Sequence, residues 1–237
     1  MVTEAIILAG GLGTRLRSVV PDLPKAMAPI GGQPLLRYLL QYLEANGIRR
    51  VVLAVGYRHE AIRGFFGSAH GGLRLVYSVE EEPLGTGGAL LQALPSIEDP
   101  YAFVLNGDTF LRLDYRDMAL TVERNEDVPL VVALRPVADA SRYGRAVVDA
   151  GRIRGFSARG TPGPGLINAG CYLVARNIFG HYPVPEKFSW EQDFLEVRAA
   201  EIQPVAFQCD VPFIDVGIPE ALCEAQTLIP EWVNASA

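Results

Sequence analysis

Apolar runs of strand length alternate with helix-like segments through the first part of the chain. The runs at 5–9, 50–56 and 101–108 are almost continuously apolar, which is typical of strands buried on both faces of a parallel sheet. The clearest intervening segment begins at Pro34, repeats leucines at helical spacing and ends before Gly47. Such alternation predicts βαβ units and a mainly parallel central sheet flanked by helices, an α/β fold.

The rhythm changes after about residue 128. Strand-rich segments follow at 129–137, 144–157 and 166–174, and helices are expected at 189–202 and 219–229. We find no internal repeat, low-complexity segment or linker. The 237 residues therefore predict a single domain over 1–237. Its first half, at about 1–127, has the strand–helix alternation typical of nucleotide-binding folds, and its second half, at about 128–237, mixes strand-rich segments with helices.

The charge of the chain limits the kinds of molecule that it is expected to bind. The formal net charge is −6 and no basic stretch is present, which argues against binding to nucleic acid or to a membrane surface. An anionic ligand would have to be held by a few placed cations and backbone N–H groups. Lysine occurs only at positions 25 and 187.

Nothing near the N-terminus resembles a signal peptide, and no window approaches 18 apolar residues, so no membrane-spanning helix is expected. The three cysteines, Cys171, Cys209 and Cys223, contain no C-x-x-C pair. We expect them to be reduced, mostly buried thiols in a cytoplasmic protein.

A glycine loop follows the first predicted strand. Ligands of open α/β sheets bind at the carboxyl ends of the strands, and glycines there let backbone N–H groups surround phosphate oxygens. The loop is not a P-loop, because Gly13 is followed by Thr14-Arg15, nor a dinucleotide loop, because Leu16 replaces the third glycine. A plain tight turn remains an alternative, but it does not explain Arg15 followed ten residues later by Lys25.

The stretches GGLGTRL (10–16) and PKAMAPIGGQP (24–34) together resemble the signature of sugar-phosphate nucleotidyltransferases. The resemblance extends from Ala5 to about Ile229. It implies the Rossmann-like, GT-A-like fold of that family, and the transfer of a nucleotidyl group from a nucleoside triphosphate to a sugar 1-phosphate. On this resemblance the catalytic residues are Arg15, Lys25 and Asp108, and the nucleotide site comprises Leu8, Ala9, Gly10, Gly11, Gly13, Thr14, Arg15, Lys25, Glu80, Gly85, Thr86 and Asn106.

This reaction needs no side-chain nucleophile. Backbone N–H groups of the loop can hold the β and γ phosphates, Arg15 suits the leaving oxygens, and Lys25 suits the α phosphate. Catalysis would rest on positioning and on neutralising charge.

Two aspartates are candidates for a metal site. The resemblance implies that Asp108, at the end of a strand, and Asp215, in FIDVGIPEAL (213–222), bind one Mg²⁺. Ile218 stands where the family usually has threonine. Asp108 alone also fits a turn or capping aspartate, and spacing in the sequence does not show that the two carboxylates meet.

The stretch EEEPLGTGGAL (80–90) resembles the base-recognition segment of the family. Glu80 would accept the N1–H and N2–H of guanine, and the following glycines would bring backbone groups up to the base. The acidic form favours guanine over a pyrimidine. A solvated acidic run is the alternative.

The sugar side also carries family motifs. Gly144, Asn168, Gly170 and Glu191 match sugar-binding positions, with Asp193 as a possible support for Glu191. The family lysine that grips the sugar phosphate is replaced by Arg159 in FSARG (156–160), and Lys187 remains an alternative for that role.

Four stretches resemble those of bacterial D-glycero-D-manno-heptose 1-phosphate guanylyltransferases, which make GDP-heptose for surface polysaccharides: GGLGTRLRSVVPDLPKAMAPI (10–30), AVGYRHEAI (54–62), YSVEEEPLGTGGAL (77–90) and LNGDTF (105–110). The expected substrates are therefore GTP and a heptose 1-phosphate, with Mg²⁺ as cofactor and a homo-oligomer as one possible assembly. Mannose 1-phosphate with GTP, or a hexose 1-phosphate with UTP or dTTP, is the first alternative. A glycosyltransferase and a binding subunit without catalysis are the others.

Overall fold

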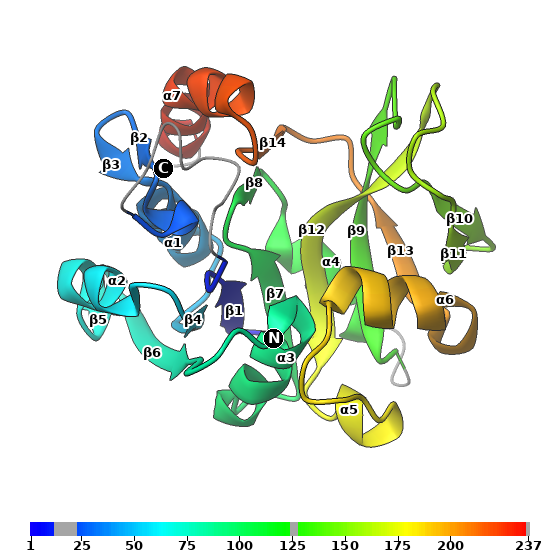
Figure 1. The fold of residues 1–237 in the computed structure, drawn as a ribbon, viewed down its shortest axis with the longest axis horizontal. Coiled ribbons are helices and arrows are strands. Elements are labelled where there is room, and N and C mark those ends of the chain that lie inside the picture. The colour runs from blue at the N-terminus through cyan, green and yellow to red at the C-terminus, as the bar shows by residue number, and fades with distance from the viewer. Residues whose placement is uncertain (12–22, 124–127, 236–237) are drawn as a thin grey trace.

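The computed structural model describes residues 1–11, 23–123 and 128–235 (Figure 1). The strands are β1 (Glu4–Leu8), β2 (Pro29–Ile30), β3 (Gln33–Pro34), β4 (Arg50–Val55), β5 (Ala69–His70), β6 (Leu73–Val79), β7 (Tyr101–Asn106), β8 (Thr109–Leu111), β9 (Leu130–Val137), β10 (Ala146–Asp149), β11 (Arg152–Phe156), β12 (Gly165–Ala175), β13 (Val205–Gln208) and β14 (Phe213–Asp215). The helices are α1 (Leu35–Ala45), α2 (His59–Phe66), α3 (Gly85–Ala93), α4 (Tyr115–Glu123), α5 (Ile178–His181), α6 (Glu196–Ile202) and α7 (Pro219–Asn234), with 3₁₀ turns η2 (Lys25–Met27) and η3 (Leu94–Ser96) and a π-helical turn η4 (Trp190–Leu195).

One ten-stranded sheet runs through the molecule in the order β10-β11-β13-β9-β12-β7-β1-β4-β6-β5. Strands β7, β1, β4 and β6 pair in parallel, which confirms the βαβ prediction for the first half. All five residues of β1 are buried, because helices cover both faces of the sheet.

The two apolar layers follow from the alternation of side chains along the strands. Ile7 and Leu53 point to the layer that contains α1, α2, α4 and α7. Ile6 and Val52 point to the opposite layer, which contains α3, α5, η4 and α6. Continuous apolar runs are required when both faces of a strand are covered in this way.

The second half differs from a mainly parallel sheet. The pairs β12–β7, β9–β12, β10–β11 and β11–β13 are antiparallel, whereas β13 runs parallel to β9. In the first half the short strand β5 also pairs antiparallel with β6. Strand β12 joins the halves, and its pairing with β9 shifts register between Asn168 and Tyr172. Because Gly170 in this irregularity has φ +69°, the strand departs from regular geometry at the predicted sugar-binding residues.

The segment 189–202, expected as one helix, is a π-helical turn followed by α6. Aromatic packing fixes this turn: the rings of Trp190 and Phe194 stack at 4.9 Å, and Tyr172 meets Trp190 edge-on at 5.6 Å. Ser189 caps its start by accepting a hydrogen bond from the Gln192 N–H at 3.1 Å.

No helix among the described residues is long and apolar enough to cross a membrane. The three cysteines are free; Cys171 and Cys209 are buried and Cys223 is exposed.

Candidate active site

Two adjoining cavities open where strands β1 and β7 end. The β1 cavity, of about 340 Å³, is lined by every described residue predicted to bind nucleotide: Leu8, Ala9, Gly10, Gly11, Lys25, Glu80, Gly85, Thr86 and Asn106. Gly13, Thr14 and Arg15 lie outside the described residues.

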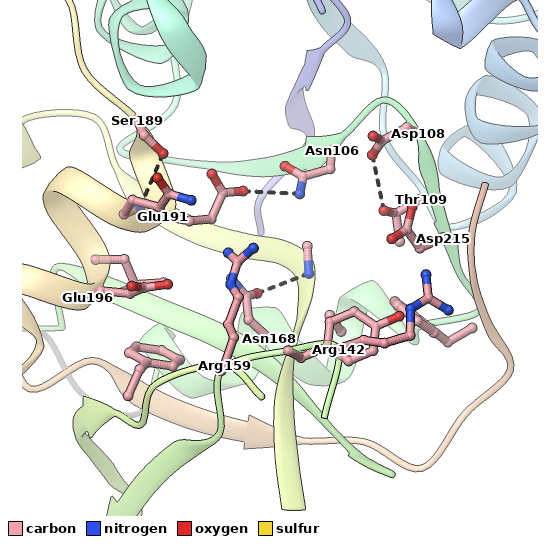
Figure 2. Close-up of a pocket in the computed structure, with 18 residues that line it drawn as sticks. Asn106, Asp108, Thr109, Arg142, Arg159, Asn168, Ser189, Glu191, Glu196 and Asp215 are labelled. Carbon is pink, nitrogen blue, oxygen red and sulfur yellow. Dashed lines mark hydrogen bonds between the residues drawn. The ribbon is translucent and has the colours of Figure 1, made fainter. Parts of the chain in front are cut away.

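The β12 cavity, of about 290 Å³, is lined by every residue predicted to bind the sugar phosphate: Gly144, Arg159, Asn168, Gly170 and Glu191 (Figure 2). The two cavities share Asn106, Asp108 and Glu191. Ligands bound in each would therefore meet at these three side chains.

Glu80 forms part of the wall of the β1 cavity. Its Oε2 accepts the Leu84 N–H at 2.9 Å. A Cβ at Gly10 would collide with the Glu80 carboxylate, so the loop glycine is needed for this close approach. Burial raises the pKa of Glu80, although the Leu84 hydrogen bond partly opposes this shift.

The glycines after Leu84 serve two different purposes. Gly85 and Thr86 line the β1 cavity, as predicted. A Cβ at Gly87 would instead collide with the Phe188 ring, and the Gly87 N–H donates to the Phe188 carbonyl at 3.0 Å. Gly87 therefore lets α3 pack closely against the segment before η4.

Asp108 and Asp215 lie at the same end of the site. Strand β8 pairs antiparallel with β14, which places Asp215 opposite Thr109. The Val216 N–H then donates to the Asp108 carbonyl at 3.0 Å. The fold thus provides the proximity that spacing in the sequence does not show.

Lys25 contributes a cation to this end. Its ammonium forms an ion pair with the Asp108 carboxylate, and its side chain is only 12% exposed. A Cβ at Gly217 would lie 3.3 Å from Lys25 Nζ and 2.8 Å from Asp215 Oδ1, so the ammonium also lies close to the second carboxylate.

The donor set fits a divalent ion that takes part of its coordination from a substrate. Among the described residues no group of three or more metal-ligating side chains occurs. Magnesium is commonly held by one or two carboxylates together with phosphate oxygens and water. Asp108 and Asp215 match that pattern.

Glu191 stands between the two cavities on the π-helical turn. Its carboxylate accepts hydrogen bonds from Thr86 Oγ1 at 3.1 Å, Asn106 Nδ2 at 3.1 Å and the Tyr172 hydroxyl at 3.3 Å. Figure 2 shows the bond to Asn106. Asn168 Nδ2 donates in turn to the Tyr172 hydroxyl at 2.7 Å, which extends the network along β12.

Asp193 holds the start of the turn that carries Glu191. Its carboxylate accepts the Ser189 N–H at 2.7 Å. π-Helical turns are frequent at functional sites because the wider turn redirects side chains.

Of the two candidates for gripping the sugar phosphate, only Arg159 lines the β12 cavity; Lys187 lines neither cavity. The residues that line the β12 cavity but were not predicted from the sequence include Arg142, Tyr143, Ser189, Gln192 and Glu196. Arg142 and Tyr143 directly precede Gly144, which was predicted from the sequence to bind the sugar. The same motif could therefore have indicated these two residues. Glu196 follows Glu191 by five residues, and its N–H bonds the Glu191 carbonyl in the π-helical pattern, which helical spacing in the sequence does not reveal.

Comparison with known proteins places this geometry in context. The Nucleotidyl transferase family model matches residues 4–231. The D-glycero-alpha-D-manno-heptose 1-phosphate guanylyltransferase of Aneurinibacillus thermoaerophilus is 42% identical over 97% of this chain and 100% of its own length. The corresponding enzyme of Campylobacter jejuni is 41% identical over 92% of this chain and 96% of its length.

Solved structures agree. HddC from Yersinia pseudotuberculosis complexed with GMP-PN is 37% identical, with a TM-score of 0.81 over 94% of this chain and 98% of that one. A Bacillus anthracis protein, described as a putative glucose-1-phosphate thymidylyltransferase, is 22% identical with a TM-score of 0.83 over 98% of each chain, which supports the fold alone. The predicted resemblance and the predicted Rossmann-like fold are confirmed. This chain belongs to the nucleotidyl transferase family.

Proposed function

We infer that this protein is a sugar 1-phosphate guanylyltransferase that condenses GTP with D-glycero-D-manno-heptose 1-phosphate and releases pyrophosphate. The observation that carries this function is the pair of adjoining cavities, which share Asp108 and Glu191 at the carboxyl end of the parallel strands. Full-length relatives of 42% and 41% identity are named for this reaction, which supports heptose as the sugar.

The β1 cavity suits the nucleotide. Glu80 presents a carboxylate that can accept both N1–H and N2–H of guanine, which a pyrimidine does not offer. Gly10 and Gly11 expose backbone close to where the phosphates would lie. Arg15, outside the described residues, remains our predicted ligand of the leaving phosphates.

The β12 cavity suits the sugar 1-phosphate. Glu191 and Asn168 are oriented polar groups for sugar hydroxyls, because each is already held by a hydrogen bond within the network around Tyr172. Gly144 and Gly170 keep the wall free of side chains, and Arg159 supplies positive charge for the phosphate.

The proposed reaction is an in-line displacement at the α-phosphorus of GTP. An oxygen of the sugar phosphate forms the new P–O bond, and the bond to the bridging oxygen of pyrophosphate breaks. Lys25 would neutralise charge on the α-phosphate, and Glu191 would hold the sugar so that its phosphate faces that atom. Mg²⁺, held by Asp108 and Asp215, would supply further neutralisation of the triphosphate charge when bound.

A turnover screen tests this function. Pyrophosphate release is measured with GTP, ATP, UTP and dTTP against heptose, mannose and glucose 1-phosphates, with Mg²⁺ and with a chelator. We expect turnover to require metal and to be greatest with GTP and the heptose. Strong turnover of UTP without turnover of GTP would contradict the base assignment, and a preference for mannose 1-phosphate would contradict the sugar assignment.

A further inference from the structure

The β12 cavity contains two guanidinium groups, of which only Arg159 was predicted from the sequence. Arg142 lies in the connection between β9 and β10 and lines the same cavity together with Asp108, Thr109 and Asp215. In Figure 2 Arg142 points to the side of the cavity where Asp215 lies, whereas Arg159 extends toward Glu191.

Among the described residues, Arg142 has no polar partner that would stabilise the fold. Its guanidinium lies over the Tyr143 ring, 5.7 Å from the centroid, and the structure gives it no ion pair or hydrogen bond within 1–11, 23–123 and 128–235. Arg145, three residues later, is the contrast: its Nη2 donates to the carbonyls of Thr161 at 2.9 Å and Gly163 at 3.2 Å, and so organises a loop.

Arg142 is exposed to the cavity, and the carboxylates Asp108 and Asp215 line the same cavity. Burial, and then the Asp215 carboxylate, raise the pKa of Tyr143, while Arg142 and Arg135 oppose this shift. The Tyr143 ring offers a platform on which the Arg142 guanidinium stacks.

The proposed reaction requires an acceptor phosphate at this end. Its oxygen must reach the α-phosphorus beside Asp108, at the junction of the two cavities. A phosphate dianion beside two carboxylates is held better when more than one cation faces it from the sugar side, and Arg142 and Arg159 both line that side. A planar guanidinium can donate two parallel hydrogen bonds to a phosphate.

We propose that Arg142, stacked on Tyr143, is a ligand of the phosphate group of the sugar 1-phosphate and shares that role with Arg159. This inference rests on the proposed function and adds a residue that determines acceptor binding. It predicts selectivity for phosphorylated sugars at this end of the cavity.

The test compares Arg142→Ala and Arg142→Lys with Arg116→Ala, which removes an exposed arginine on α4 that lines neither cavity. We expect Arg142→Ala to raise KM for the sugar 1-phosphate by roughly 10- to 100-fold, the loss of a charge-assisted contact, and to change KM for GTP by less than about 3-fold. Arg142→Lys should raise KM for the sugar 1-phosphate less than Arg142→Ala does. Lysine keeps the positive charge but cannot donate two parallel hydrogen bonds as the guanidinium does. Arg116→Ala should behave like the unmodified protein.

An unchanged KM for the sugar 1-phosphate in Arg142→Ala would overturn the role of Arg142, provided that the unmodified protein turns over. A rise confined to KM for GTP would also overturn it, because the guanidinium would then serve the triphosphate. Absence of turnover by the unmodified protein with every sugar phosphate would overturn the proposed function itself.

Discussion

Lys25 and Asp108, which form an ion pair, have the two central roles in the proposed reaction. The ammonium is nearly buried beside two carboxylates, an arrangement that balances charge in the absence of substrate. In the proposed reaction each partner would serve a different ligand, with Lys25 on the α-phosphate and Asp108 on the metal. The pair therefore predicts that neither residue tolerates loss of its charge.

Asp108→Asn should reduce turnover by about three orders of magnitude or more, because the amide is a poor ligand for Mg²⁺ and leaves Lys25 without its partner. Binding of a GTP analogue without metal should survive. Steady-state pyrophosphate release and equilibrium binding in a chelator measure the two quantities. Asp210→Asn, an exposed aspartate outside both cavities, is the matched control, and full metal-dependent activity of Asp108→Asn would refute the metal role.

Glu80 carries a second prediction because burial raises its pKa. A carboxyl whose pKa is higher in the folded state destabilises the fold above that pKa, and this penalty is relieved as the pH falls. Glu80→Gln should therefore leave the midpoint of thermal unfolding at pH 7 unchanged or higher. It should also raise KM for GTP by roughly 10- to 100-fold, through loss of hydrogen bonds to a charged group.

Acidification provides the complementary test of Glu80. In the unmodified protein KM for GTP should rise as the pH falls through the raised pKa, and Glu80→Gln should lack this dependence. Glu82→Gln, an exposed neighbour in the same acidic run, should keep it. Equal behaviour of the two variants would mean that the run is only a solvated acidic segment.

At the scale of elements, the sequence predicts those whose signal is local. The strands of the parallel half, helices α1, α2 and α3, and the long helix α7 all follow from periodicity and end signals. Strands β8 and β14 have three residues each, too few to show periodicity, although their pairing is what brings Asp215 to Asp108. The missed strand β13 has only four residues, and the π-helical turn has no sequence signature comparable to the glycine loop.

The residues of the candidate site were likewise predicted where a local motif marks them and missed where none does. Family motifs identified Gly10, Glu80 and Glu191, which the structure places on the cavity walls. Gln192 and Glu196 were missed because their exposure to the cavity depends on how the turn winds. Arg142 was missed because its exposure to the cavity depends on the course of the connection between β9 and β10.

Thr86 links two elements and provides a prediction at this scale. Its hydroxyl accepts the Trp190 N–H at 2.9 Å and donates to Glu191 Oε2 at 3.1 Å, so it ties α3 to the π-helical turn. Thr86→Val keeps the shape but leaves the Trp190 N–H without its acceptor. We expect a loss of about 1–3 kcal/mol in the free energy of unfolding and a higher KM for the sugar 1-phosphate.

Chemical denaturation and steady-state kinetics check both effects of Thr86→Val. Thr227→Val, an exposed position on α7, is the control for introducing valine on a helix. Wild-type stability together with wild-type KM for the sugar would show that this bond does not hold Glu191 in place.

At the scale of the whole molecule, the ten-stranded sheet buries its parallel centre under two apolar layers. The functional groups lie at the ends of β1 and β7 and at the register shift within β12. Cys171 lies within this sheet and Cys209 follows β13, both buried, whereas Cys223 is exposed on α7. Burial raises the pKa of the Cys171 thiol, and that of Cys209 to about 11.

Thiol reactivity therefore reports on the integrity of the whole fold. Because the thiolate is the reactive form, we expect one cysteine to react rapidly with a thiol reagent in the folded protein and all three after unfolding. Spectrophotometric titration with and without denaturant measures both numbers. Rapid reaction of Cys171 in the folded protein would contradict the packing of β12 against β7.

The central claim is that the nucleotide occupies the β1 cavity, with its phosphates next to Lys25 and a divalent ion between Asp108 and Asp215. A crystal structure with a non-hydrolysable GTP analogue and Mn²⁺, whose anomalous scattering locates the metal, tests this most directly. We predict a metal peak bound by both carboxylates, guanine against Glu80 and a phosphate oxygen within hydrogen-bonding distance of Lys25. A nucleotide bound elsewhere, with no phosphate contact to Lys25 and no metal at the two aspartates, would contradict the account.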